Sequence, residues 1–446
     1  MTIAVIPATA LLLFAGGCAL WAQPSMHRES KDYLDAVHGL SLSELLTRAR
    51  EAYPAILAAR EQVDAARGAR LQAGLKTNPA IDVSYLSGPL VRNGGEDQFS
   101  VQLSLLVERR GKRAARMNLA NQEIDVRKGQ ESVETRRIDY EVKRAYYDAL
   151  AAVQILRTTE SLIALTERNL TLIRARVQHG ESAELEGRLA RVEVERLRAT
   201  LPAAGAAVEQ ALLQLATWTQ LPAAGIRLKT GNPPPPEGLS PEKLLPLALS
   251  ARPELQVLEA EWKRAEADAS LARQQARPDP TWYVQFNKGR SQNAQFGVDA
   301  AGLPARVRDN DNILGGGVSI PLAIRDRNQG RIAAADAEAR AASLRRDAGR
   351  RLVEGEVRRA LLEWQSSRES ARRLSANVLG QTRENLKTIQ ASYELGELRL
   401  LDVLQEQRRL LELEREYAGL LRAASFALVE LERSMGSDLS TQGAVQ

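Results

Sequence analysis

Residues 98–105 read Gln-Phe-Ser-Val-Gln-Leu-Ser-Leu, so polar and apolar side chains alternate at every position. Because successive side chains of a β-strand point to opposite faces, this stretch predicts a strand with one apolar and one polar, uncharged face. Residues 81–85, 282–287 and 314–320 show the same alternation. Each predicted strand is close to the roughly 9 to 11 residues that a tilted strand needs to cross a bilayer. A half-exposed sheet of a soluble protein would also alternate in this way.

The four predicted strands form two pairs, one in each half of the chain, and a long charged loop is expected between residues 287 and 314. Four strands cannot close into a barrel. An open sheet edge in lipid would leave backbone groups without partners, at a cost of several kcal/mol each. The strands therefore predict an oligomer, in which two chains would supply eight strands and three would supply twelve.

Long helices account for most of the remaining sequence. Between about residues 109 and 178 there is no proline, and glycine occurs only at Gly111 and Gly129. About seventy helical residues at roughly 1.5 Å each form a rod on the order of 100 Å long. A second rod is expected at about residues 326–395, and each rod should turn at a Gly-Glu pair into a return helix. The low aromatic content, 4%, is typical of long helices.

The two halves of the chain repeat one another. Pro79 and Pro278 are separated by the same interval as Pro54 and Pro253. Further on, residues 141–145 (EVKRA) match residues 356–360 (EVRRA), and Gly180-Glu181 matches Gly396-Glu397 at an interval one residue longer.

An apolar heptad seam near the end of the first half is matched, at this last interval, by an apolar residue at every position of the second half. We therefore predict a duplicated chain. Pro202 interrupts the first seam, but since the seam continues beyond it, we expect one bent helix. The two seams are Val194, Leu197, Leu201, Ala204, Val208, Ala211 and Leu215, and Leu410, Leu413, Tyr417, Leu420, Ala424, Ala427 and Leu431.

The N-terminus carries a predicted secretory signal at residues 1–22, because an apolar run is followed by small residues. Ala15-Gly16-Gly17-Cys18 is similar to a bacterial lipoprotein cleavage site and would leave Cys18 as a lipidated N-terminus; cleavage after Ala22 is the alternative. The remaining predicted divisions are a first repeat at residues 23–232, a Pro-rich linker at 233–239, a second repeat at 240–436 and a flexible tail at 437–446.

The composition argues against an enzyme. The three histidines and one cysteine are scattered, so we expect neither a metal site nor a cofactor. Gly315-Gly316-Gly317 lacks the Lys-Ser/Thr of a phosphate-binding loop and lies in a predicted strand. The net charge of +5 balances 61 basic against 56 acidic residues that interleave along helices, so no nucleic-acid partner is expected.

The order helix, strand, strand, long helix, turn and return helix occurs twice behind the signal, and it resembles the TolC family of outer-membrane efflux proteins over nearly the whole mature chain. Residues 319–322 (SIPL) with 327–332 (RNQGRI) resemble the branch that serves heavy-metal pumps of the resistance-nodulation-division type. Residues 393–397 (YELGE), leading to 401–405 (LDVLQ), resemble the family's periplasmic hairpin tip.

The resemblance implies a mainly α fold with a membrane β-barrel. In a homotrimer, twelve strands would form a pore in outer-membrane lipid and twelve helices a tunnel across the periplasm. The trimer would dock to a periplasmic adaptor protein and, through it, to an inner-membrane resistance-nodulation-division transporter, as a passive exit duct for heavy-metal cations. Type I protein secretion and multidrug efflux remain alternatives, as do a periplasmic adaptor, which has a single hairpin, and a coiled-coil structural protein, which has no use for strands.

The resemblance also assigns site residues. Asp402 matches a position of the periplasmic gate, and Gln405 stands where the family often has a second aspartate; the alternative for Asp402 is a solvated carboxylate at a helix start. The hairpin turns are the expected adaptor-docking surface, although their glycines would also serve simply to permit left-handed backbone at helix ends. These tip residues are Gly180, Glu181, Ser182, Gly396, Glu397 and Leu398.

Overall fold

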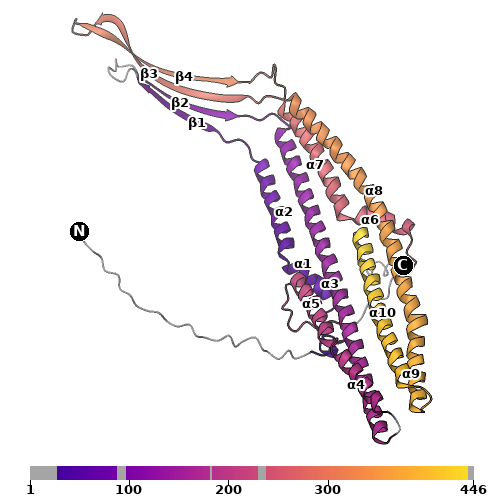
Figure 1. The fold of residues 1–446 in the computed structure, drawn as a ribbon. Coiled ribbons are helices and arrows are strands. Elements are labelled where there is room, and N and C mark those ends of the chain that lie inside the picture. Colours follow the sequence, from indigo (N-terminus) through magenta and orange to yellow (C-terminus); the bar gives the residue numbers. More distant parts are fainter. Residues whose placement is uncertain (1–27, 88–96, 181–182, 230–237, 440–446) are drawn as a thin grey trace, which may run out of the picture.

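The computed structural model describes residues 28–87, 97–180, 183–229 and 238–439. The predicted signal with Cys18, the tip residues Glu181 and Ser182, and most of the Pro-rich linker lie outside the described residues. Figure 1 shows an elongated molecule in which the four strands lie at one end and the helices run away from them to the opposite end.

Both halves contain the same succession of elements, as the sequence predicted. A single turn of 3-10 helix, η1 (Ser30–Asp32), precedes them. The first half consists of α1 (Leu42–Ala52), α2 (Pro54–Ala73), β1 (Ala80–Ser87), β2 (Asp97–Leu106), α3 (Lys112–Gln178), α4 (Glu184–Arg198) and α5 (Leu201–Thr219). The second half consists of α6 (Pro241–Ala251), α7 (Pro253–Gln275), β3 (Thr281–Val298), β4 (Pro304–Ser319), α8 (Gln329–Arg373), the π-helix η2 (Leu374–Leu379), α9 (Gly380–Glu394) and α10 (Leu400–Met435).

The repeated prolines mark helix starts. Pro54 is the first residue of α2, and Pro253 is the first residue of α7. Proline suits this position because its missing N–H would have no partner in the first turn and its fixed φ is already helical. The residue before each proline is extended, so α1 and α6 end there and the chain changes direction.

The two predicted rods are present, and they differ in one respect. The first, α3, is 67 residues of uninterrupted α-helix. The second runs from α8 through α9 and contains the six-residue π-helix η2. The repeat interval lengthens by one residue between Glu356 and Gly396, and η2 lies between these residues. A π-helical turn takes up one extra residue without ending a helix, so η2 accommodates an insertion in the second rod.

The expectation of one bent helix through Pro202 was wrong. α4 ends at Arg198 and α5 begins at Leu201. Pro202 has no N–H to donate to the carbonyl of Arg198, and the Thr200 N–H bonds to Leu197, three rather than four residues earlier, so the α-helical ladder is interrupted after Ala199. The apolar seam nevertheless continues, since Val194, before the break, and Val208, after it, are both buried.

The two strand pairs join into one antiparallel sheet in the order β1-β2-β3-β4. The central contact is between repeats, since β2 of the first half pairs with β3 of the second, for example Val101 with Phe286. All three pairings are antiparallel, so each strand lies beside a neighbour in the sequence order.

The prediction of a long charged loop between residues 287 and 314 was wrong. β3 continues to Val298 and β4 starts at Pro304, so only a short turn connects them. The backbone ladder does not depend on side-chain charge, and here polar side chains support it, because Arg290 Nε donates to Asn310 Oδ1 at 3.4 Å.

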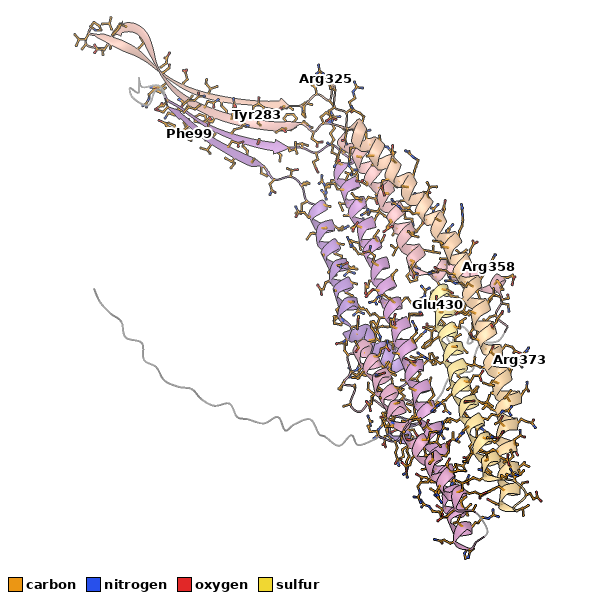
Figure 2. All side chains as sticks on the ribbon, in the orientation of Figure 1. Phe99, Tyr283, Arg325, Arg358, Arg373 and Glu430 are labelled. Carbon is orange, nitrogen blue, oxygen red and sulfur yellow. The ribbon has the colours of Figure 1, made fainter. Side chains whose placement is uncertain are left out.

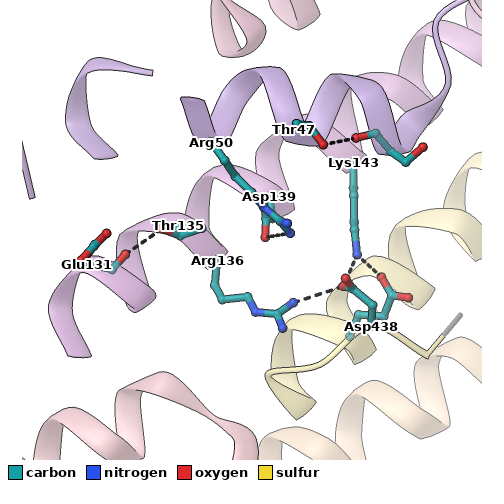
Figure 3. Close-up of polar contacts among 10 residues, drawn as sticks. Thr47, Arg50, Glu131, Thr135, Arg136, Asp139, Lys143 and Asp438 are labelled. Atoms are coloured by element: carbon teal, nitrogen blue, oxygen red, sulfur yellow. Dashed lines mark hydrogen bonds and ion pairs between the residues drawn. The ribbon is translucent and has the colours of Figure 1, made fainter. Parts of the chain in front are cut away.

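Charged side chains are buried where the C-terminal turn packs on α3. Lys143 Nζ donates to Glu432 Oε2 at 2.5 Å and to Asp438 Oδ1 at 2.6 Å, and Arg136 also reaches Asp438 at 3.2 Å (Figure 3). Leu439 is buried in the core formed by α6, α8 and α10. These contacts correct the prediction of a flexible tail from residue 437, because Asp438 and Leu439 are held by charge and apolar burial; residues 440–446 lie outside the description.

Candidate functional site: membrane sheet and helical tips

The register of the sheet gathers apolar side chains on one face. Val101 lies opposite Val83 on one side and Phe286 on the other, and Leu103 lies between Ile81 and Val284. Because these neighbours are apolar and Phe286 in turn pairs with Leu314, an apolar band crosses all four strands. In the single chain this face is largely exposed. Its large exposed members are Ile81, Val83, Tyr85, Phe99, Leu103, Leu105, Trp282, Val284, Phe286, Leu314 and Val318.

The opposite face is polar. Gln102 lies between Asp82 and Gln285. Ser84 and Ser100 are joined by a hydrogen bond between their hydroxyls at 2.6 Å. A sheet with one apolar and one polar face suits a wall between lipid and an aqueous lumen.

Glycines on β4 make room for an aromatic ring. A Cβ on Gly317 would lie 2.7 Å from the Tyr283 hydroxyl, so the Tyr283 ring would have to shift to admit a larger residue there. The ring of Tyr283 therefore lies over the backbone of β4, on the polar face of the sheet.

Both rods turn back at the end of the molecule farthest from the strands (Figure 1). The turn glycines have left-handed backbone, with φ of 76° at Gly180 and 82° at Gly396. An L-residue with a side chain is strained there, so glycine is the residue that lets each helix end and reverse. Helix reversal thus gives both glycines a structural role. The two tips lie beside each other, since a Cβ on Gly396 would be 3.8 Å from an Arg176 guanidinium nitrogen.

Asp402 lies just beyond the second tip, at the third position of α10. Its carboxylate accepts a hydrogen bond from the backbone N–H of Arg399 at 3.0 Å, which caps the start of the helix. The side chain is half-buried, while Gln405, one turn further, is exposed. Asp402 therefore lies at a helix start, which was the alternative to a gate position, and it also lies next to the tip where the gate was expected.

An arginine links the two hairpins at their tips. Arg176 on α3 donates to the backbone carbonyl of Tyr393 on α9 at 2.9 Å, and its guanidinium carbon is 5.3 Å from the Tyr393 ring centroid. The Tyr393 hydroxyl in turn lies 3.4 Å from Glu186 Oε2 on α4. One aromatic side chain of the second hairpin is therefore held by both helices of the first.

A buried carboxylate makes a second link further from the tip. Glu193 on α4 is only 3% exposed and receives hydrogen bonds from Arg408 on α10 at 2.7 Å and from Arg196 at 2.7 Å. Burial alone would raise the pKa of Glu193, but the two guanidinium groups outweigh it and hold that pKa below its usual value. The carboxylate therefore stays charged at neutral pH and joins the hairpins.

The sequence analysis quoted Tyr393 as part of a motif but assigned no role to Arg176, Glu186, Glu193 or Arg408. A signal existed for Glu193, since it directly precedes Val194, the first residue of the apolar seam, and so lies at the edge of a buried stripe. Its partner was not visible, because Arg408 is 215 residues away in the chain.

The sequence model of the outer membrane efflux protein family matches residues 45–219 and 244–437, which together are most of the chain. The chain belongs to the outer membrane efflux protein family. It is therefore a component of an outer-membrane efflux channel that extends into the periplasm.

Several known proteins are similar to this chain over most of their length. The cobalt-zinc-cadmium resistance protein CzcC of Cupriavidus metallidurans is 25% identical over 405 residues, covering 90% of this chain and 91% of CzcC. A crystal structure of CusC superposes with a TM-score of 0.69 at 17% identity, covering 94% of this chain and 98% of CusC. VceC of Vibrio cholerae gives a TM-score of 0.68 at 17% identity, covering 89% and 96%. These structures share the fold of this family member.

Within the described residues, no helix has both the length and the apolar composition needed to cross a membrane. In the same part of the chain, no three His, Cys, Asp or Glu side chains are grouped as a metal-binding set requires.

Proposed function

We propose that three copies of this chain form the outer-membrane exit duct of a tripartite efflux pump that exports heavy-metal cations. The main support for the trimer is the four-stranded sheet, whose outer strands β1 and β4 each have one unpaired edge within the chain. Lipid offers no hydrogen bonds, so these edges need partners from other copies. Edge-to-edge pairing of β4 with β1 of the next copy would satisfy both.

The number of copies follows from the need for a lumen. Two copies would close a barrel of eight strands, and such a barrel has an interior just wide enough for side chains to fill it. Three copies would close a barrel of twelve strands, which leaves space inside. An exit duct requires that space. The polar face with Gln102 and Gln285 would then line the lumen, and the apolar face with Val101 and Phe286 would contact lipid.

The helical tips are the proposed docking surface for a periplasmic adaptor, which would connect the duct to an inner-membrane resistance-nodulation-division transporter. Gly180 and Gly396 reverse the two rods at the end of the molecule farthest from the strands (Figure 1). The proposed surface combines these glycines with the residues that follow them in the sequence, Glu181, Ser182, Glu397 and Leu398. An adaptor reaching from the inner membrane meets this end first.

Asp402 is the proposed gate residue. In a trimer, three Asp402 carboxylates near the tips would form a ring that attracts cations, with Gln405 one turn further into the lumen. Replacing Asp402 by Asn should lower the preference for cations over anions in reversal-potential measurements, while Gln405→Glu should raise it. An unchanged preference in both variants would refute this assignment.

The cargo assignment rests on two supports. Residues 319–322 and 327–332 resemble the heavy-metal branch, and the relative CzcC is a cobalt-zinc-cadmium resistance protein by name. Deleting the gene should sensitise cells to divalent metal cations and leave drug resistance unchanged. Sensitivity to drugs alone would favour a multidrug channel, and loss of a secreted polypeptide would favour type I secretion.

The trimer has its own test. Protein extracted from outer membranes should have the mass of three mature chains by native mass spectrometry and should form large, mostly closed channels in planar bilayers. A monomer without conductance would overturn the proposal.

The same mass spectrum tests whether Cys18 is lipidated, since a chain that starts at Cys18 and carries acyl groups would differ in mass from one cleaved after Ala22.

A further inference from the structure

Every connection between the membrane sheet and the helices carries exposed basic side chains. Lys76 lies between α2 and β1, Arg110 between β2 and α3, and Arg277 between α7 and β3. The fourth connection, between β4 and α8, carries two arginines. We call six residues the junction cations: Lys76, Arg110, Arg277, Arg325 and Arg327 in the connections, and Arg113 in the first turn of α3.

The junction cations lie at a common level relative to the sheet. The end of the sheet nearest the helices is marked by pairs such as Leu106 with Thr281. Lys76, Arg110 and Arg277 are each four residues outside the last residue of their strand. Figure 2 shows Arg325 at the same junction, between the end of β4 and the start of α8. The positive charges therefore surround the sheet where it meets the helices.

Two acidic side chains of this region are already ion-paired: Glu108 with Arg116, and Asp279, whose Oδ2 accepts from Lys112 Nζ at 2.7 Å. Asp326, between Arg325 and Arg327, accepts from the backbone N–H of Asn328 at 2.9 Å and offsets only one of the two neighbouring arginine charges. The six junction cations are exposed, and none is ion-paired with a carboxylate in the described part of the chain. Their charge is thus available to an external anion.

Apolar and aromatic side chains lie directly beside this level. Trp282, on the apolar face between Leu105 and Val318, is 56% exposed one residue inside the sheet edge. Leu322 and Ile324, between β4 and Arg325, are also exposed, at 77% and 70%. Tryptophan at the end of a membrane strand is typical of the lipid headgroup level. The junction cations follow immediately on the side of the helices.

We propose that the junction cations form a collar that binds the anionic headgroups of phospholipids in the periplasmic leaflet of the outer membrane. The helices lie on the periplasmic side, so this collar faces that leaflet. Arginine donates paired hydrogen bonds to phosphate oxygens, and a basic side chain near an anionic lipid surface favours binding about fivefold. Phosphatidylglycerol has the required chemistry, and phosphatidylcholine, with no net charge, lacks it.

The test uses the full-length protein, purified in detergent and incubated with an equimolar mixture of phosphatidylglycerol and phosphatidylcholine. After re-isolation, the bound lipids are counted by mass spectrometry. The wild type should be enriched in phosphatidylglycerol, and about 0.5 M NaCl should reduce that enrichment by screening the charges. The variant R110Q/R277Q/R325Q/R327Q should lower the enrichment about tenfold or more.

A matched control removes the same charge elsewhere. Arg174, Arg191, Arg340 and Arg351 are exposed on helices and have no ion pair among the described residues. The variant R174Q/R191Q/R340Q/R351Q should keep the wild-type enrichment. Equal loss in the control and the junction variant, or no enrichment in the wild type, would overturn the proposal. Displacement of the lipid by inorganic phosphate, but not by NaCl of the same ionic strength, would also overturn it, because the collar would then bind free anions.

The proposal fails independently of the proposed function. The junction variant should still form channels in planar bilayers and should melt within a few degrees of the wild type, because the replaced side chains are exposed. A wild-type trimer that conducts but shows no lipid preference would refute the lipid-binding collar and not the exit duct. A wild type without conductance would refute the exit duct instead. The lipid count would remain interpretable in that case, because it needs only the folded chain.

Discussion

Arg176 and Tyr393 meet at the tips of the two hairpins, where the Arg176 guanidinium donates to the Tyr393 carbonyl at 2.9 Å and faces its ring at 5.3 Å. These residues belong to different halves of the duplicated chain. The contact therefore joins the two hairpins at the end of the molecule that carries the proposed gate residue Asp402. Loosening it should favour separation of the tips.

Replacing Arg176 by Met should raise the open probability of the channel. The substitution removes a charge-assisted hydrogen bond and a cation–π contact, for which about 1 kcal/mol, or about fivefold in open probability, is expected at this half-buried site. Single-channel recording in planar bilayers measures the change. The control is Arg174→Met, which removes an exposed arginine from the same helix and should leave the open probability unchanged. Equal effects of both variants would contradict a specific role of Arg176.

Acid should weaken the Glu193–Arg408 link between the hairpins. The pKa of Glu193 is lower in the folded protein than in the unfolded chain, so the stabilisation is complete above the unfolded pKa of about 4.3. It is lost as the pH falls through the lower, folded pKa. Conductance should be constant from neutral pH to about 5 and should rise below about 4.

Glu193→Gln should raise the conductance at neutral pH and remove its dependence on acid through this link. Glu195→Gln is the matched control, because Glu195 is exposed and pairs with Arg198 within α4, at 2.8 Å, rather than across the hairpins. A wild-type acid response that persists unchanged in the Glu193 variant would exclude this carboxylate as its source.

Lys143→Met should destabilise the protein by about 3 kcal/mol, because it leaves the buried Glu432 carboxylate without its cation. Burial lowers the pKa of Lys143, but Glu432 and Asp438 outweigh it, so the ammonium is charged in the folded state. Thermal unfolding followed by circular dichroism measures the loss. Lys128→Met, at an exposed lysine of the same helix, should change stability by about 0.5 kcal/mol or less. A mild effect at Lys143 would mean that the site rearranges.

Deleting Ala376 from η2 should leave the stability unchanged or raise it. A π-helical turn holds one residue more than an α-helical turn, so removing one residue restores a regular α-helix and keeps the rest of the rod in register. Leu379 and Leu386, which are buried against α3 and α10, would then stay in the core. The melting temperature measures the outcome, with Ala376→Gly as a comparison that costs about 1 kcal/mol. A deletion variant that melts well below Ala376→Gly would contradict the view that η2 accommodates one inserted residue.

Two helical glycines should respond in opposite directions to alanine. A Cβ on Gly129 of α3 would lie 2.7 Å from Val257 Cγ2 on α7, and valine is stiff about χ1, so Gly129→Ala should destabilise. A Cβ on Gly355 of α8 meets nothing within 4 Å, so Gly355→Ala should stabilise by about 1 kcal/mol. Chemical denaturation of both variants checks the signs. Stabilisation by both would mean that α3 and α7 separate without cost.

Elements with a strong local period were predictable. The alternation around Val101 located β2, and the absence of proline located α3 to within a few residues. The proline at position 202 was visible, but whether it bends or interrupts a helix depends on packing on both sides. The extension of β3 past Asn287 was not predictable from its charged residues, because the backbone ladder with β4 supports it.

In the candidate site, too, local features were predictable from the sequence and long-range contacts were not. Gly180 and Gly396 were identifiable because a reversal between long helices needs left-handed backbone, which is a property of one residue. The Arg176–Tyr393 contact was not identifiable, because the two residues are 217 positions apart and only the packing of α3 against α9 brings them together. The spacing of apolar and polar side chains is a local property of the sequence, and it determined the duplicated strands and rods. Which strand pairs with which, and which charges meet in the interior, was decided by tertiary structure, because such contacts depend on the arrangement of the whole chain.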